Sequence, residues 1–99
     1  MNANSLDIIK KVDNELFENM SKTRDMTFED GALIKKNKLL IALALDAAHG
    51  AVNGVKSLAS QAIQNGASKE EIMEALRVAN YVSGAGSIYT AANAFKDIF

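Results

Sequence analysis

Apolar residues recur at three- and four-residue intervals along most of the chain, the spacing that places side chains on one face of an α-helix. In the N-terminal segment, charged and amide side chains alternate with a stripe made of Leu6, Ile9, Val12, Leu16, Phe17 and Met20. The stripe predicts one amphipathic helix within residues 1–25, capped near Asn4 or Ser5 and docked onto the rest of the protein. Residues 21–25 are predicted to form a polar link after it.

The segment from Lys36 to about His49 is apolar on nearly every side. This pattern predicts a central helix that is buried on most faces, either by its own domain or by neighbouring subunits. Gly50 and Gly54 follow, and a glycine just past the last helical residue is the usual left-handed terminator. We therefore expect the chain to break here and a second helix to start.

The clearest boundary lies at Asn65 and Gly66, because Ser68 and Glu71 directly after it have the spacing of a capping box. A further interruption, Ser83-Gly84-Ala85-Gly86, precedes a last helix from about residue 87 to 99. Proline is absent, and good helix formers such as Ala, Leu, Lys and Glu dominate. The 99 residues are thus predicted to form one domain, an all-α bundle of five to six helices.

Composition excludes several classes of function. The eleven Lys and Arg residues are scattered among twelve Asp and Glu, so no basic stripe predicts nucleic-acid binding. Cysteine is absent and there is a single histidine, which leaves no disulfide, no thiol nucleophile, no expected metal site and no expected cofactor. The longest apolar run contains Asp46 and is too short to cross a bilayer, and the start lacks a secretory signal. We expect a cytoplasmic protein without a membrane span.

The order of helix, glycine break, helix, Gly-Ala-Ser turn and helix resembles the carboxymuconolactone decarboxylase and alkylhydroperoxidase D-like family. Its most specific piece is Gly66-Ala67-Ser68 followed by Glu70, Glu71 and Ile72. The other matching stretches are residues 38–44, 61–65, 74–76 and 82–88. The resemblance implies an alkylhydroperoxidase D-like fold with residues 36–99 as the family core.

The peroxide-reducing branch of that family begins one helix with Cys-x-x-Cys-x-x-x-His and places a proton-relaying acidic residue on the preceding helix. The resemblance puts the cysteine positions at Ala51 and Gly54, the histidine position at Leu58 and the acidic position near Leu39. Alanine and glycine cannot replace a thiolate nucleophile, so no peroxidase or disulfide reductase activity is expected. The decarboxylase branch also uses a histidine where Leu58 stands.

A relocated site is an alternative. Asp46, His49 and Asn53 would share one helical face if the helix continues, and an imidazole oriented by a carboxylate is a usable general base. Such a site would suit a decarboxylase or lyase acting on a small carboxylated lactone or related acid, with Lys56 or Arg77 pairing the carboxylate. The simpler interpretation is that Asp46 and His49 only finish the helix.

Tyr81 is a further candidate for lining a small-molecule pocket, with packing as the alternative. The most strongly implied partner is the chain itself, because its apolar surface exceeds what one thin domain can cover. The resemblance implies a trimer or a hexameric ring. We therefore expect a catalytically silent homo-oligomer with a structural or small-ligand-binding role; the lyase around His49 and mixing into the ring of an active paralogue are the alternatives.

Overall fold

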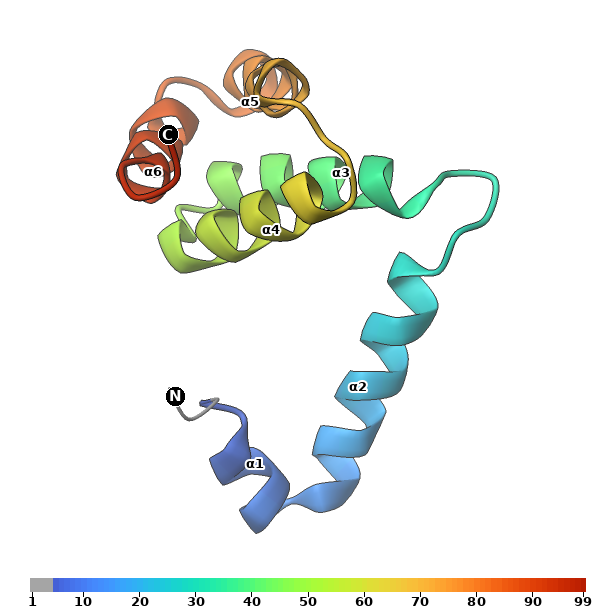
Figure 1. Cartoon of the computed structure of the whole chain (residues 1–99). Helices are drawn as coiled ribbons and strands as arrows, with labels where there is room; N and C mark the ends of the chain where they lie inside the picture. The colour runs from blue at the N-terminus through green and yellow to red at the C-terminus, as the bar shows by residue number, and fades with distance from the viewer. Residues whose placement is uncertain (1–4) are drawn as a thin grey trace.

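Six helices joined by short turns make up the computed structural model, which describes residues 5–99 (Figure 1). They are α1 (Asp7–Val12), α2 (Asn14–Phe28), α3 (Lys35–Ala48), α4 (Val52–Gln64), α5 (Lys69–Ser83) and α6 (Gly86–Phe95). The described residues contain no strand, so the predicted all-α fold is confirmed.

Helix α3 lies at the centre of the four-helix core and contacts α4, α5 and α6. Its core stripe, Leu39, Leu43 and Ala47, recurs every four residues and is fully buried or nearly so. The neighbouring helices contribute mostly small side chains, which allow the helix axes to approach closely. The buried apolar residues of these helices and their turns are Val55, Ala59, Ala62, Ala67, Ile72, Leu76, Ala79, Ala91, Ala94 and Phe95.

The turns follow the predicted glycine signals. Gly50 after α3, Gly66 after α4 and Gly84 after α5 all have positive φ, at 78°, 92° and 88°. An L side chain is strained in this conformation and glycine is not, so each glycine ends its helix where the sequence indicates. The chain changes direction at each of these points, which brings four helices together in one core.

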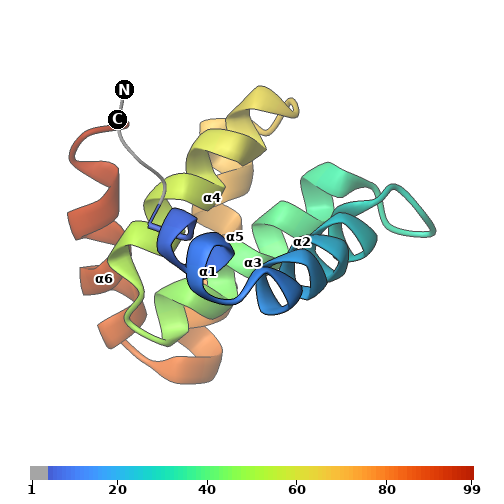
Figure 2. The ribbon, with the colours of Figure 1, turned by 90° about the horizontal axis from the view of Figure 1, so that it is seen from below.

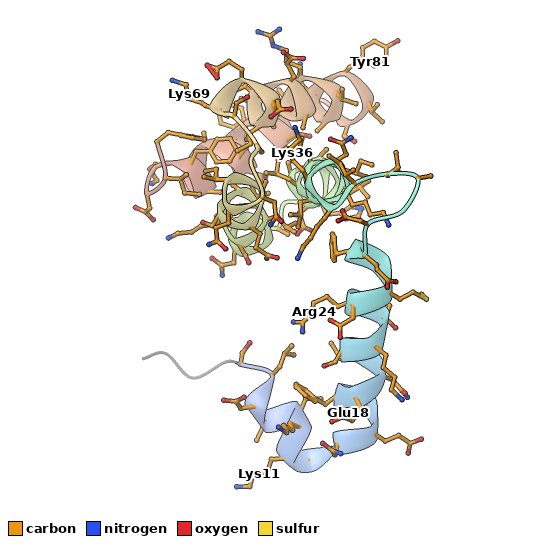
Figure 3. All side chains as sticks on the ribbon, turned by 45° about the vertical axis from the view of Figure 1, so that its right-hand side comes forward. Lys11, Glu18, Arg24, Lys36, Lys69 and Tyr81 are labelled. Carbon is orange, nitrogen blue, oxygen red and sulfur yellow. The ribbon has the colours of Figure 1, made fainter. Side chains whose placement is uncertain are left out.

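The predicted capping box at the start of α5 is present in full. The Ser68 hydroxyl accepts a hydrogen bond from the Glu71 N–H at 3.0 Å, and the Glu71 carboxylate accepts one from the Ser68 N–H at 2.9 Å. The same carboxylate accepts a hydrogen bond from Lys36 Nζ at 2.8 Å, which ties the start of α5 to the first turn of α3. Figure 3 shows Lys36 directed from α3 towards α5.

The prediction of one helix over residues 1–25 is wrong, because two helices meet at Asp13. This residue has φ −145° and ψ 81°, and its carboxylate accepts a hydrogen bond from the Leu16 N–H at 3.0 Å, as an N-cap residue does. The predicted polar link is helical instead, within α2, where the Thr23 hydroxyl donates to the Asn19 carbonyl. Leu6 is the N-cap residue of α1, whereas Asn4 lies outside the described residues.

We call α1 and α2 together the N-terminal arm. The arm contains no buried residue, α1 contacts α2 but none of the core helices, and α2 contacts only α3 and α1. Its attachment is at the C-terminal end of α2, where Phe28 packs against the core and Lys38 Nζ donates to the Glu29 carbonyl. The arm extends away from the core and α1 turns back beneath it (Figures 1 and 2).

The extended arm leaves the chain less compact than its length predicts. The radius of gyration is 14.4 Å, against about 12.6 Å for a typical domain of this length. Within the part of the chain that the structure describes, no helix has both the length and the apolar character needed to cross a membrane.

Candidate functional site

The candidate site lies where α3 ends and α4 begins, the region in which the family resemblance places its chemistry. His49 follows the last residue of α3 and donates its backbone N–H to the Leu45 carbonyl at 3.0 Å. After Gly50, the Ala51 N–H donates to the Asp46 carbonyl at 2.9 Å, which closes the turn, and Ala51 is the N-cap residue of α4. The turn brings Asp46 close to the first turn of α4.

The four positions to which the resemblance assigns reactive groups serve packing or turn formation here. Leu39 is fully buried in the core, and Leu58 is half-buried and packs against the same cluster. Ala51 and Gly54 are half-buried at the start of α4. None of the four side chains can act as a nucleophile, acid or base, because none carries a thiol, hydroxyl, imidazole or carboxyl group.

The carboxylate of Asp46 fills the space in which a side chain at position 54 would begin. A Cβ built on Gly54 would overlap Oδ2 of Asp46 and would lie 2.8 Å from its Cγ, closer than real side chains approach. The space beside Gly54, the position that the resemblance assigns to the second cysteine, is therefore filled by a half-buried carboxylate from α3. A carboxylate is favoured there because the first turn of a helix carries unpaired N–H groups and a partial positive charge.

The structure does not form the single helical face that would join Asp46, His49 and Asn53. Helix α3 ends at Ala48, and the positive φ of Gly50 redirects the chain before Asn53 enters α4. His49 and Asn53 are exposed, whereas Asp46 is half-buried. Asp46 and His49 are not hydrogen-bonded to each other through their side chains, so no carboxylate orients the imidazole.

The remaining candidates lie away from this turn. Tyr81 is 91% exposed and projects from the outer end of α5, away from α3 and α4 (Figure 3). Lys56 Nζ donates to the Asp97 carboxylate at 2.7 Å, so this ammonium already has a partner. The charge of Lys56 holds the pKa of Asp97 below its ordinary value, chiefly through this hydrogen bond. Arg77 is exposed on α5.

Hollows of the surface lie away from this turn. One of about 520 Å³ is lined by Arg24, Asp25, Phe28, Glu29, Asp30, Lys35 and Gln61. Among residues 5–99, no group of three or more His, Asp or Glu side chains is placed to hold a metal ion. The turn between α3 and α4 therefore offers one carboxylate and one exposed imidazole as its ionisable groups.

Sequence reasoning missed the pairing of Asp46 with Gly54. The available signal was a glycine inside a helix, which costs about 1 kcal/mol relative to alanine and usually has a packing reason. We expected Gly54 to belong to the chain break, but it is the third residue of α4 and has an ordinary backbone conformation. Glycine at this position leaves room for the Asp46 side chain that lies against it.

Comparison with known proteins identifies the family. The sequence profile of the carboxymuconolactone decarboxylase family matches residues 14–97, which run from the first residue of α2 almost to the end of the chain. The chain therefore belongs to this family. No curated protein matches it in a sequence comparison.

A solved structure shows the same fold. The chain is similar to the apo form of a carboxymuconolactone decarboxylase family protein from Legionella pneumophila, with 33% sequence identity and a TM-score of 0.86. The match covers 92% of this chain and 81% of the other. The family expected from the residues around the Gly-Ala-Ser turn is confirmed, and the match extends to α2 of the N-terminal arm.

Proposed function

We propose that this chain is a member of the carboxymuconolactone decarboxylase family without peroxide-reducing chemistry, which works in the cytoplasm as a homo-oligomeric structural or small-ligand-binding protein. The observation that carries the proposal is the overlap between a Cβ at position 54 and the Asp46 carboxylate. The second cysteine position is not merely changed to glycine, because another side chain has taken its space.

Peroxide reduction by a dithiol has two steps that both need sulfur. A thiolate attacks the peroxide O–O bond and releases an alcohol while it becomes a sulfenic acid, and the second thiol then displaces water to form a disulfide. Ala51 and Gly54 supply neither sulfur, and no cysteine occurs elsewhere in the chain. Leu58 and Leu39 supply no base or acid to assist the steps. The chain therefore lacks every reactive group that these two steps need.

The homo-oligomeric part of the proposal is supported by the amount of exposed surface. The chain exposes 6844 Å², whereas a folded monomer of this mass exposes about 5,500 Å². Large apolar side chains contribute to this surface on both sides of the molecule, including Val12 on the arm and Val78 and Val82 on α5. Exposed large apolar side chains of this kind are found at subunit interfaces.

The test of the proposed chemistry is an assay of the purified protein with cumene hydroperoxide and a dithiol donor, with an active dithiol member of the family as the positive control. We expect peroxide consumption equal to that in buffer. Consumption that rises in proportion to protein concentration would contradict the proposal. Light scattering coupled to gel filtration at micromolar concentration tests the assembly, and a mass of 10.6 kDa would contradict it.

A lyase is a second candidate because Asp46 offers a half-buried carboxylate with no hydrogen-bonding partner, next to the exposed His49. A carboxylate within reach of a bound small acid could transfer a proton to or from it. Incubation with a panel of carboxylated lactones would reveal this activity. Loss of turnover in both Asp46→Asn and His49→Ala, with Tyr81→Phe unchanged, would support it over the silent role.

A further inference from the structure

The dipeptide Asn-Gly occurs twice in the chain, at residues 53–54 and 65–66. An asparagine before glycine is prone to deamidation, because glycine has no Cβ to hinder the approach of its backbone nitrogen to the asparagine side chain. The two sites lie at opposite ends of α4, one in its first turn and one just after its last residue. Both asparagines are exposed, so exposure alone does not distinguish them.

The turn around Asn65 is held by hydrogen bonds between exposed residues. Residues 63–66 are all exposed, and a Cβ built on Gly66 would meet no atom within 4 Å. The Gly66 N–H donates to the Ile63 carbonyl at 3.0 Å, the bond that a glycine makes in a Schellman motif. Helix ends open at a low cost in free energy. Local opening can therefore release the Gly66 nitrogen without moving a core side chain.

The surroundings of Asn53 are more constrained. The Val55 N–H donates to the Ala51 carbonyl at 2.9 Å, and the Val55 side chain is fully buried. The Asp46 carboxylate fills the space beside Gly54. Rotation of the backbone between Asn53 and Gly54 would therefore break the first turn of α4 and shift a core residue.

We propose that Asn65 is a site of spontaneous deamidation in the folded protein, that Asn53 is protected, and that the conversion loosens the turn between α4 and α5. The Gly66 nitrogen loses its proton to solvent and attacks Cγ of Asn65. The N–Cγ bond forms, the Cγ–Nδ2 bond breaks, and ammonia leaves with a proton from solvent. Water then opens the resulting succinimide ring at either carbonyl and gives aspartate or isoaspartate. One water is consumed, and nothing is oxidised or reduced.

The conversion changes a contact that closes the end of α4. Nδ2 of Asn65 donates to the Gln61 carbonyl at 2.8 Å. A carboxylate has no proton to donate, and the last carbonyls of a helix carry a partial negative charge. The aspartate product therefore loses this hydrogen bond and is repelled by the helix end. The isoaspartate product also adds one carbon to the main chain, which lengthens the path from α4 to the Ser68 cap of α5.

The first test follows both sites in one sample of the full-length protein. Trypsin cuts after Lys38, Lys56 and Lys69, so the two Asn-Gly sequences fall in separate peptides, 39–56 and 57–69. After incubation in mildly alkaline buffer, we expect peptide 57–69 to show the mass shift of an amide-to-acid conversion at least several-fold faster than peptide 39–56. A sample digested before incubation corrects for conversion during digestion.

Two controls separate the effect of the fold from that of the local sequence. In urea, both peptides should convert at similar rates, because only the Asn-Gly sequence then acts. Asn65→Gln should abolish the conversion of peptide 57–69 in the folded protein, because a longer side chain forms the cyclic imide much more slowly. Methylation by protein isoaspartyl methyltransferase should label the same peptide and confirm that the succinimide formed.

Asp30 also precedes a glycine, and its carboxylate accepts a hydrogen bond from the Lys35 N–H at 2.6 Å. Isomerisation of an aspartate passes through the same kind of ring but leaves the mass unchanged. Methylation there would be assigned to peptide 25–35. The conversion at Asn65 is therefore measured separately.

The second test measures the consequence for stability. Asn65→Asp reproduces the aspartate product, and we expect a lower Tm than that of the natural protein at neutral pH. The difference should shrink as the pH falls through about 3.9, the ordinary pKa of aspartate, because the protonated carboxyl is uncharged and can donate again. An unchanged Tm at neutral pH would overturn the loosening of the turn.

The outcomes of the first test decide the site. Equal conversion of the two peptides in the folded protein would overturn it, and so would faster conversion of peptide 39–56. Absence of conversion at Asn65 over a period in which the unfolded protein is converted would also overturn it. None of these results bears on the proposed function, which the peroxide assay and the mass in solution test separately.

Discussion

Helices α2 and α5 are equal in length and each begins with a side-chain N-cap, but α5 is packed into the core and α2 is not. Each has 15 residues, and each is capped by a side chain that accepts a hydrogen bond from a backbone N–H three residues later. Helix α5 buries Ile72, Leu76 and Ala79 in the core, whereas α2 buries no residue. Local signals therefore suffice to form a helix, but they do not decide whether its apolar stripe is covered within the chain.

The reason lies in how each helix is attached. The turn at Gly66 returns the chain against α3, and the Glu71 carboxylate joins α5 to Lys36. The link between α2 and α3, residues 29–34, instead lets the two helices diverge, so contact is limited to the region of Phe28 (Figure 1). The core is thus stabilised by its own packing, and the apolar side of the arm remains available to another molecule.

The largest expected contrast between the two regions comes from removing one buried side chain. Leu43 is fully buried in α3, so Leu43→Ala should lower the free energy of unfolding by about 2–5 kcal/mol. Met26→Ala on the arm should change it by no more than about 0.5 kcal/mol. Urea denaturation followed by circular dichroism measures both, and comparable losses would show that the arm is as integral to the folded chain as the core.

A second substitution tests the contact between Asp46 and position 54. Gly54→Ala should stabilise the protein by less than the about 1 kcal/mol that alanine usually adds over glycine in a helix, because the new methyl group must displace the carboxylate. In the background of Asp46→Ala the same change should stabilise the protein by the full amount of about 1 kcal/mol, since alanine favours helix. The measurement is thermal or urea unfolding of the four proteins of this double-mutant cycle.

The control for that cycle is Gly31→Ala, in the link between arm and core. A Cβ at Gly31 would have no atom within 4 Å, so this change should be tolerated. Additive effects of Asp46→Ala and Gly54→Ala would contradict the steric account of the site. The same cycle is informative for Gly54→Cys, which should also be better tolerated once Asp46 is replaced.

Removal of the two helix caps should separate global from local effects. Ser68→Ala at the start of α5 should cost about 1 kcal/mol of global stability. Asp13→Ala removes the bond that Asp13 accepts from the Leu16 N–H at 3.0 Å, and we expect it to loosen the joint between α1 and α2 with little effect on global unfolding. Hydrogen exchange distinguishes a loss of global stability from local opening of the arm. An equal loss of global stability from both substitutions would contradict local opening of the arm.

The smallest expected effect concerns pH. The hydrogen bond from Lys36, with that from the Ser68 N–H, holds the pKa of Glu71 below its ordinary value. Because the folded-state pKa is depressed, the contribution to stability is fully present near neutral pH and is lost as pH falls through and below the usual glutamate range, about 4.3. Glu71→Gln should flatten the fall in Tm below that range.

Asp97→Asn is a second test of acid sensitivity, because the pKa of Asp97 is also lowered, chiefly by its hydrogen bond with Lys56. Both pairs lie at the surface, and both should weaken as salt is added. If Glu71→Gln leaves the pH dependence of Tm unchanged, the bond between α3 and α5 makes no contribution to acid stability.

Much of the fold could be predicted from residues that are close in sequence. The apolar spacing, the glycines at 50, 66 and 84 and the capping box of Ser68 and Glu71 located the core helices within a few residues. The N-terminal segment was predicted less well, because Asp13 is one of several polar residues there and its role as a cap depends on a backbone conformation that the pattern does not reveal. Residues 21–25 are polar but helical, which composition alone does not indicate.

Part of the candidate site could likewise be predicted from the sequence, and part could not. That the chain has no cysteine, and leucine, alanine or glycine at the family's reactive positions, follows from the sequence and its resemblance. The proximity of Asp46 to Gly54 does not, because the two residues belong to different helices and meet only through the turn at Gly50. The shared face proposed for Asp46, His49 and Asn53 required one continuous helix, and that turn prevents it.

The sequence by itself determined roughly where the core helices start and stop and which reactive groups the protein lacks, since caps, glycine terminators and residue chemistry act over a few neighbouring positions. Only the tertiary structure decided which apolar stripes are covered and which side chain fills the space at Gly54. Burial depends on the direction in which each turn sends the next helix. Two helices of equal length, each with a side-chain N-cap, therefore form part of an exposed arm in one case and of the buried core in the other.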